Sequence, residues 1–310
     1  MSIRPRTGSF KGQKIRRITP ELKIDVSAAR CIPPLFRPPF LKAAVEGRHR
    51  KHLKEVLSIV GIPPAQITGQ DLKGVLDCLY NLLVTSYRCE YVFKNIIANA
   101  LFLDLHDPAE ALLTGEFRSG ESRADVVILN GTSSVYEIKT EYDSFVKLPS
   151  QLSDYRKIFD RIWVVVPDQL VSSALKLVDE GTGLLGIGEK LQITTIREPI
   201  SNKSNTSPSQ IFDCMRKSEY TAIIHEVTGA VPNVSNGLMF GACKSIFQGL
   251  EPSSAHDLMV RHVKRRSNNA ISSLLSATPS SLAHLCLSLK ESKTCLERIL
   301  LVLNSRVDTI

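Results

Sequence analysis

The feature that most constrains the fold is a pair of short apolar runs on either side of Asn130-Gly131. The runs RADVVIL (123–129) and SVYEIKTE (134–141) are rich in β-branched residues, and Asn-Gly is typical of a tight hairpin turn. Farther along, RIWVVV (161–166) is almost continuously apolar, as expected for a strand that is covered on both faces. The three runs therefore predict a β-sheet covered by helices, in a mixed α/β fold.

Apolar residues at helical spacing surround these strands. They predict three helices before the hairpin, over 38–60, 68–86 and 89–103, with Thr68 as the N-cap of the second. A further helix is expected over 149–160, between the hairpin and the apolar strand. The chain is accordingly expected to divide into a basic, largely irregular arm (1–37), N-terminal helices (38–87), a mixed α/β core (88–200), a polar linker (201–209) and a C-terminal helical domain (210–310).

The charge of the chain is unevenly distributed. The net charge is +8, and residues 1–60 hold 14 Lys and Arg against 4 Asp and Glu. Such a basic segment favours a polyanionic partner, here nucleic acid, and a solubilising tail is the alternative. No apolar run is long enough to span a membrane, and the seven cysteines form no CxxC pair. We therefore expect a cytoplasmic protein with no membrane partner.

The hairpin carries charges where apolar residues would pack better. Glu137 and Lys139 are two residues apart on a strand, so both point to the same face. If the turn spans residues 130–132, Asp125 lies directly opposite Glu137, with facing Cβ atoms about 5 Å apart. A two-residue turn would instead place Asp125 opposite Tyr136. We predict the three-residue turn.

Asp125 and Glu137 would then be two facing carboxylates, which repel each other unless a cation or a proton neutralises them. Oxygen ligands favour Mg²⁺ or Mn²⁺ over zinc. A lysine beside such a metal can orient a water molecule or stabilise charge on a phosphate. Together with Lys139, the pair has the chemistry that hydrolysis of a phosphodiester bond requires. The alternative is that all three are ordinary solvent-exposed strand charges.

These residues and the helix that follows them resemble a known family. The motif D-x(11)-E-I-K over 125–139, followed by Q-x-x-x-Y over 151–155, is similar to the PD-(D/E)xK nuclease superfamily in its QxxxY-containing, exonuclease-like branch. The proline of the family name is replaced here by Ala124. As a whole, residues 88–200 resemble a group of uncharacterised bacterial proteins that are predicted nucleases. The resemblance implies a restriction-endonuclease-like mixed sheet flanked by helices, with helical N-terminal and C-terminal extensions.

The resemblance also implies roles for individual residues. The implied ligands of Mg²⁺, or of Mn²⁺, are Glu90, Asp125, Glu137 and the carbonyl oxygen of Ile138. The implied catalytic residues are Asp125, Glu137, Lys139, Gln151 and Tyr155. Three further residues are candidates for supporting the ligands or approaching a phosphate: Glu116, Asp143 and Arg123.

The position of the third carboxylate has two alternatives. Glu90 is the first candidate, but it could instead form an i,i+4 salt bridge with Lys94 on a solvated helix face. Glu116, expected on a first strand over 115–119, competes with Glu90 for the same position. The sequence leaves both alternatives open.

The sequence as a whole predicts a Mg²⁺-dependent deoxyribonuclease, with DNA favoured over RNA as the nucleic acid. An uncommon nuclease core joined to its own flanking domains suits phage defence or a mobile element. One alternative is a catalytically inactive protein of the same fold that binds nucleic acid or a partner, and another is an interaction protein whose hairpin charges face solvent. The C-terminal helical domain is the candidate surface for a protein partner or a homodimer.

Overall fold

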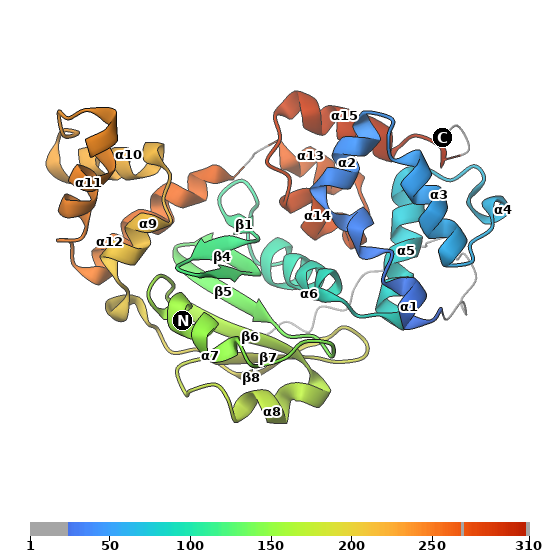
Figure 1. The fold of residues 1–310 in the computed structure, drawn as a ribbon, viewed down its shortest axis with the longest axis horizontal. Helices are drawn as coiled ribbons and strands as arrows, with labels where there is room; N and C mark the ends of the chain where they lie inside the picture. The colour runs from blue at the N-terminus through green and yellow to red at the C-terminus, as the bar shows by residue number, and fades with distance from the viewer. Residues whose placement is uncertain (1–23, 268–269, 308–310) are drawn as a thin grey trace.

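A six-stranded mixed β-sheet lies at the centre of the protein (Figure 1). The computed structural model describes residues 24–267 and 270–307. In spatial order the strands are β1 (Leu112–Thr114), β4 (Val126–Asn130), β5 (Thr132–Ile138), β6 (Arg161–Pro167), β7 (Gly183–Ile187) and β8 (Ile193–Arg197). Strands β5, β6 and β7 are parallel to one another, and the other pairs are antiparallel. The expected mixed α/β fold is confirmed.

The parallel strands are joined by helical crossovers, as parallel pairing requires. Helix α7 (Leu148–Arg156) connects β5 to β6, and η3 (Asp168–Leu170) with α8 (Val171–Leu175) connects β6 to β7. The strand expected over 115–119 does not join this sheet. Instead, β2 (Phe117–Ser119) pairs with β3 (Ser122–Ala124) in a separate two-stranded ribbon, and the edge strand β1 precedes it.

The two faces of the sheet pack against different groups of helices. Val127, Leu129 and Val135 belong to one hydrophobic cluster, which includes residues of α7 and of α9 to α12. Val126 and Ile128 alternate with them and belong to the other cluster, which includes the N-terminal helices and α13 to α15. This alternation is the reason that neighbouring apolar residues of β4 are all buried.

The N-terminal helices differ from the expected ones in three places. The helix expected over 38–60 is divided in two at Gly47, whose φ of 72° is incompatible with a continuous α-helix. The N-cap of the next helix is Asp71, which accepts from the N–H of Gly74, rather than Thr68. Residues 1–23 of the expected irregular arm lie outside the described residues, and the remainder of it contains two helical turns. The elements are α1 (Val26–Ala29), η1 (Pro33–Phe36), α2 (Pro38–Val45), α3 (Arg50–Ile59), α4 (Pro64–Ile67), α5 (Leu72–Ser86) and α6 (Glu90–Ile97), which a π-helical turn over Ala98–Leu103 extends.

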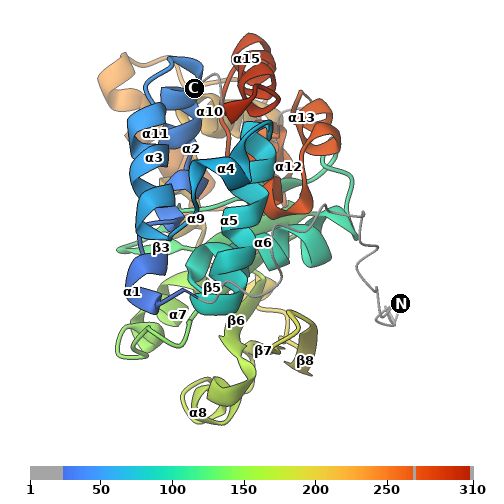
Figure 2. The same ribbon diagram turned by 90° about the vertical axis from the view of Figure 1, so that its right-hand side faces the viewer.

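The C-terminal segment is helical and divides between the two clusters. Helices α9 to α12 pack beside one face of the sheet, whereas α13 to α15 pack against the N-terminal helices (Figure 1). Figure 2 shows α15 and α13 beside α5 on one side of the strands, with α8 on the other. The elements are η4 (Lys203–Asn205), α9 (Pro208–Asp213), α10 (Lys217–Thr228), α11 (Asn236–Phe247), α12 (Pro252–Val263), η5 (Lys264–Arg266), α13 (Ile271–Ala277), η6 (Ser280–Leu282), α14 (Ala283–Leu287) and α15 (Lys293–Leu303).

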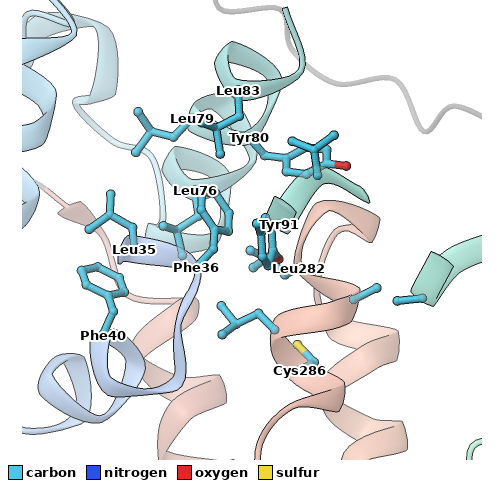
Figure 3. Packing of buried hydrophobic residues seen from close by; sticks show 14 of the residues in the cluster. Leu35, Phe36, Phe40, Leu76, Leu79, Tyr80, Leu83, Tyr91, Leu282 and Cys286 are labelled. Carbon is cyan, nitrogen blue, oxygen red and sulfur yellow. The ribbon is translucent and has the colours of Figure 1, made fainter. Parts of the chain in front are cut away.

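Tyr91 of α6 is a point of contact between the two ends of the chain. Its ring stacks on Phe36 with a centroid separation of 4.5 Å, and its hydroxyl donates to the carbonyl of Ser281 at 2.8 Å. Figure 3 shows Leu282 packed next to the same ring. The contact fixes η6 and α14 against α6. Among residues 24–267 and 270–307, no helix is long and apolar enough to cross a membrane.

Candidate functional site

The hairpin has the predicted register. Strands β4 and β5 pair without a bulge, and residues 130–132 close the turn. Gly131 at its centre has a φ of 71°, which glycine adopts without a steric penalty. The three-residue turn is confirmed, and extending the register by one pair places Asp125 opposite Glu137.

Asp125 lies between β3 and β4, beside the C-terminal end of β5. Its Oδ2 accepts a hydrogen bond from the N–H of Ile138 at 2.7 Å. Burial, followed by the charges of Glu137 and Glu90, raises the pKa of Asp125 to about 8, although Lys94 acts in the opposite direction. A carboxyl group with this pKa holds a proton at neutral pH unless a cation takes the proton's place.

Glu137 is the centre of a network that joins β5 to α7. Its Oε1 accepts from Lys139 Nζ at 2.7 Å, and its Oε2 accepts from the Tyr155 hydroxyl at 2.6 Å. Lys139 also donates to Gln151 Oε1 at 3.0 Å, and the Tyr155 hydroxyl lies 3.1 Å from the carbonyl oxygen of Arg123. The two parts of the sequence motif, at the end of β5 and on α7, are therefore in direct contact.

The network is shielded from water. Glu137 is 1% exposed and Tyr155 is fully buried. Burial, followed by the charge on Glu137, raises the pKa of Tyr155 far above its ordinary value. Tyr155 therefore keeps its proton and acts as a fixed donor to Glu137. Both oxygens of Glu137 are engaged within the protein, so its carboxylate is held in one orientation.

Three carboxyl groups converge beside this network. One carboxylate oxygen from each of Glu90, Glu116 and Asp125 lies within 4.8 Å of the other two. The expected set had Glu137 and the backbone of Ile138 in place of Glu116. Glu137 instead directs its oxygens to the lysine and the tyrosine, and Ile138 contributes its N–H to Asp125.

Glu116 reaches this cluster from a turn and not, as expected, from a strand. It lies between β1 and β2 with a φ of 53°, in the left-handed region that costs a non-glycine residue about 1–2 kcal/mol. A Cβ at the preceding residue, Gly115, would make a tight contact, because it would lie 3.1 Å from the carbonyl oxygen of Asp125. A strained residue beside a tight glycine is typical of a functional position.

Lys94 of α6 lies among the three carboxylates. Its Nζ forms ion pairs with Glu90 and, at 3.0 Å, with Glu116. The salt bridge weighed as an alternative role for Glu90 is therefore formed, with the Glu90 side chain 52% exposed and the Lys94 side chain 9% exposed. Burial lowers the pKa of Lys94, and the carboxylates, Glu90 first, outweigh burial and raise it.

The other two candidates are placed differently. Asp143 accepts from the N–H and the hydroxyl of Thr140, at 2.8 and 2.7 Å, and so stabilises the loop that follows β5. Arg123 contributes its carbonyl oxygen to Tyr155, and its side chain is exposed on β3. Neither side chain is part of the carboxylate cluster.

The donor set of the cluster fits a hard divalent cation. Four carboxylates, those of Glu90, Glu116, Asp125 and Glu137, surround two ammonium groups. With every group ionised, two negative charges are left in excess. Glu137 is buried, whereas the side chains of Glu90 and Glu116 are 52% and 61% exposed, so solvent can reach the cluster. Carboxylate oxygens are the ligands that Mg²⁺ and Mn²⁺ prefer. Glu90, Glu116 and Asp125 are therefore of a type that could hold Mg²⁺ or Mn²⁺.

The protein also has an open hollow of about 730 Å³ between α3 and α4. Most of its lining is apolar, including Leu53, Leu57 and Ile62, and Arg50 and Lys54 also line it. Its lining includes none of the residues of the carboxylate cluster or of the Glu137 network. The convergence of titratable groups, rather than this hollow, marks the candidate site.

Comparison with known proteins gives the family. The family model described as Bacteriophage P4 protein cII matches residues 84–286. The chain belongs to the bacteriophage P4 protein cII family. The segment shared with the cII family begins in the last turn of α5 and ends within α14, so it includes the whole sheet, the carboxylate cluster and some of the helices on each face.

Two individual proteins are similar to parts of this cII family member. Protein cII of Enterobacteria phage P4 is 32% identical over 63 residues, which are 20% of this chain and 24% of that protein. The match therefore spans about a quarter of the relative's length. Among solved structures, the SPO1766 protein of unknown function from Silicibacter pomeroyi is 18% identical, with 38% of this chain and 80% of that chain covered, and its TM-score of 0.28 is too low to establish a shared fold.

Two features of the site were not found from the sequence. Lys94 is four residues after Glu90, which suggested a salt bridge, and its neighbours Tyr91 and Ile97 could have indicated that this face of the helix is buried. His284 of α14 also packs against α6, through Asn95 and Tyr91. No sequence signal links residues that are about 190 positions apart.

Proposed function

We propose that this member of the cII family is a metal-dependent nuclease that hydrolyses phosphodiester bonds of DNA. The observation that carries the proposal is the meeting of Lys139 and Glu137, at the end of β5, with Gln151 and Tyr155 of α7. A hairpin whose charges merely faced solvent would not be buried and paired in this way. The arrangement supports a restriction-endonuclease-like core, in which the ends of the central strands carry the reactive groups.

The residues of the site would have different roles in hydrolysis. A Mg²⁺ or Mn²⁺ ion held by Glu90, Glu116 and Asp125 would polarise a water molecule and offset charge on the phosphate. Lys139 is held by Glu137 and Gln151, and its ammonium has three N–H donors. One N–H therefore remains to orient the attacking water or to donate to a phosphate oxygen. Tyr155 holds Glu137, and through it Lys139, in place.

DNA is the proposed substrate because the chain combines this site with a basic segment. The excess of lysine and arginine within residues 1–60 would contribute sequence-independent attraction to a phosphate backbone. A family named for a bacteriophage protein favours a mobile element over phage defence as the setting. We propose a mobile element as the first biological setting and phage defence as the second.

One observation favours the alternative, a catalytically inactive protein of the same fold that binds nucleic acid or a partner. Lys94 already neutralises part of the carboxylate cluster, and both oxygens of Glu137 have partners within the chain. A protein without metal chemistry would be stable in this state. Cleavage assays separate the two functions.

The test is cleavage of linear and circular DNA, single- and double-stranded, and of RNA, with Mg²⁺ or Mn²⁺. The parent is compared with Lys139→Ala and Asp125→Ala, and Lys147→Ala, an exposed lysine before α7, is the matched control. We expect cleavage by the parent and the control alone. Equal cleavage by all four proteins would identify a contaminating nuclease, and binding without cleavage by the parent would support the alternative.

A further inference from the structure

Lys94 occupies the position that a metal ion would take in the carboxylate cluster. Its ammonium group is paired with Glu90 and Glu116, and Asp125 adds to the charge that it neutralises. The side chain is 9% exposed, on a helix whose other buried residues are mostly apolar. A divalent ion bound to the carboxylate oxygens that Lys94 contacts would repel this ammonium group. Binding of the ion would therefore favour displacement of the ammonium group.

His284 lies against the same part of α6. Its backbone N–H donates to Asn95 Oδ1 at 3.0 Å, and its ring meets Tyr91 edge-on with a centroid separation of 5.9 Å. Tyr91 and Lys94 are three residues apart and so share one face of the helix. The Nε2 atom of His284 lies 3.8 Å from the point where a Cβ on Gly115 would be. The ring therefore points toward the turn that carries Glu116.

The Nε2 atom of His284 is buried and has no hydrogen-bond partner. The residue is 8% exposed. Its Nδ1 faces Ser288 Oγ at 3.5 Å, and that hydroxyl donates to the carbonyl oxygen of His284 at 2.7 Å. Because the hydroxyl proton is used there, we assign the imidazole proton to Nδ1, which leaves Nε2 as an acceptor. Burial, followed by the positive charge of Lys94, lowers the pKa of His284 to about 3, so the ring stays neutral.

A buried acceptor without a donor is unfavourable and calls for a physical reason. The charge of Lys94 acts on His284, and the Lys94 side chain is 9% exposed. An ammonium group that left the carboxylates and turned inward would be unfavourable without a new acceptor. A neutral imidazole nitrogen can accept its hydrogen bond and keep the charge solvated.

We propose that Lys94 is the resident cation of the carboxylate cluster, and that His284 Nε2 accepts the Lys94 ammonium group when a divalent cation binds Glu90, Glu116 and Asp125. His284 is thus a positioning residue, supplied by α14, that makes metal binding depend on the C-terminal segment. The inference rests on the metal site of the proposed function but not on cleavage. No bond is formed or broken, because one hydrogen-bonded ammonium group changes its partner.

The test is a double-mutant cycle on Mn²⁺ affinity, measured by titration calorimetry with the full-length chain. Lys94→Met removes the competing cation, so Mn²⁺ should bind about tenfold more tightly. His284→Phe removes the acceptor, so Mn²⁺ should bind about tenfold more weakly; both changes are of the size typical of coupled sites. In the Lys94→Met background, His284→Phe should have no effect. That loss of effect is the coupling that the proposal requires.

Two matched variants control for general effects. His49 is also buried with unpartnered ring nitrogens, so His49→Phe shows the effect of replacing such a ring away from the site. Lys244 is a partly buried lysine paired with Asp213, so Lys244→Met shows the effect of losing a paired lysine. Neither should change Mn²⁺ affinity.

Each result of the cycle supports or overturns the inference. An equal effect of His284→Phe in both backgrounds, or no effect in either, overturns it while leaving the proposed metal site intact. Binding to Lys94→Met but not to the parent supports the role of Lys94 and contradicts a metal-loaded parent enzyme. Failure of both the parent and Lys94→Met to bind Mn²⁺ overturns the inference and the proposed function together. Thermal unfolding shows that each variant is folded.

Discussion

The Tyr155 hydroxyl donates a hydrogen bond of 2.6 Å to Glu137 Oε2. The donor lies on α7 and the acceptor on β5, so the bond fixes the crossover helix to the strand before it. Because the other Glu137 oxygen accepts from Lys139, the orientation of the lysine depends on the tyrosine. A single hydroxyl therefore holds the central part of the candidate site.

Replacement of Tyr155 by Phe removes that hydroxyl and leaves the ring in place. We expect the free energy of unfolding to fall by about 2 kcal/mol, because hydrogen bonds to charged groups contribute about 1.5–3 kcal/mol. Loss of a partner behind a functional carboxylate typically reduces activity by about 10–100-fold. Urea unfolding and DNA cleavage measure the two effects. Tyr142→Phe, at a half-exposed tyrosine, should change neither, and full activity of Tyr155→Phe would contradict its role.

The raised pKa of Asp125 predicts how stability depends on pH. In the unfolded chain an aspartate titrates near about 3.9, whereas burial and the neighbouring carboxylates raise the pKa of Asp125 to about 8 in the folded protein. Between these values the unfolded chain has released the proton and the folded protein keeps it. The contribution to stability is complete below about pH 4 and is lost as the pH rises through about 8.

Asp125→Asn removes this titration. Without divalent ions, we expect the parent to lose stability between about pH 5.5 and about pH 8.5, and the variant to lose less. Urea unfolding with a chelator present gives the two slopes. Asp104→Asn, at an exposed aspartate, should behave as the parent does. Parallel slopes for the parent and Asp125→Asn would contradict the raised pKa.

The left-handed backbone at Glu116 predicts an unusual effect of glycine. Both Glu116→Gln and Glu116→Gly remove a carboxylate, so both should lose the stabilisation that Mn²⁺ gives the parent. That stabilisation is about 2.7 kcal/mol when the ion is at 100 times its Kd. Glycine also removes the strain at a φ of 53°, so Glu116→Gly should be more stable than Glu116→Gln by about 1 kcal/mol.

The control for this comparison is Glu121, an exposed residue in the turn between β2 and β3. Its φ is not positive, so glycine there should be less stable than glutamine because it is more flexible when unfolded. The order of the two variants should therefore reverse between the two positions. The same order at both would show that Glu116 is not strained.

Local patterns in the sequence were sufficient to predict the hairpin. The Asn130-Gly131 dipeptide between two apolar runs predicts both strands and the turn, because turn chemistry acts over a few residues. The register that places Asp125 opposite Glu137 required a choice between two turn lengths. The four-residue spacing of Gln151 and Tyr155 likewise places both on one face of α7. These parts of the site depend on neighbours in the sequence.

Other parts of the site depend on packing between distant segments. Position 116 is a glutamate and not a glycine or asparagine, so its residue type does not signal a positive φ. The surrounding turn imposes this backbone conformation against the preference of the residue. Lys94 is buried because η6 and α14 cover α6. A periodic pattern shows that a helix face will be covered but not which segment covers it, and for that reason neither contact could be predicted.

A last prediction concerns a Ser-His-Asp arrangement whose serine and histidine are buried and whose aspartate is exposed. His256 Nε2 of α12 lies 2.7 Å from Ser133 Oγ of β5, and His256 Nδ1 lies 3.2 Å from Asp257 Oδ1. The serine and the histidine are both fully buried, and Ser133 Oγ also accepts from the N–H of Asp160 at 2.9 Å. A nucleophile must be reached by its substrate, so we expect these residues to join α12 to the sheet without a catalytic role.

We expect His256→Phe to lower the free energy of unfolding by about 1–3 kcal/mol, because Ser133 is left as a buried donor without an acceptor. Ser133→Ala in the same chain removes that donor, so the double variant should cost less than the sum of the single ones. Urea unfolding of the four proteins measures the coupling. A serine-directed fluorophosphonate should not label the parent, and labelling at Ser133 would show that the hydroxyl is accessible and reactive.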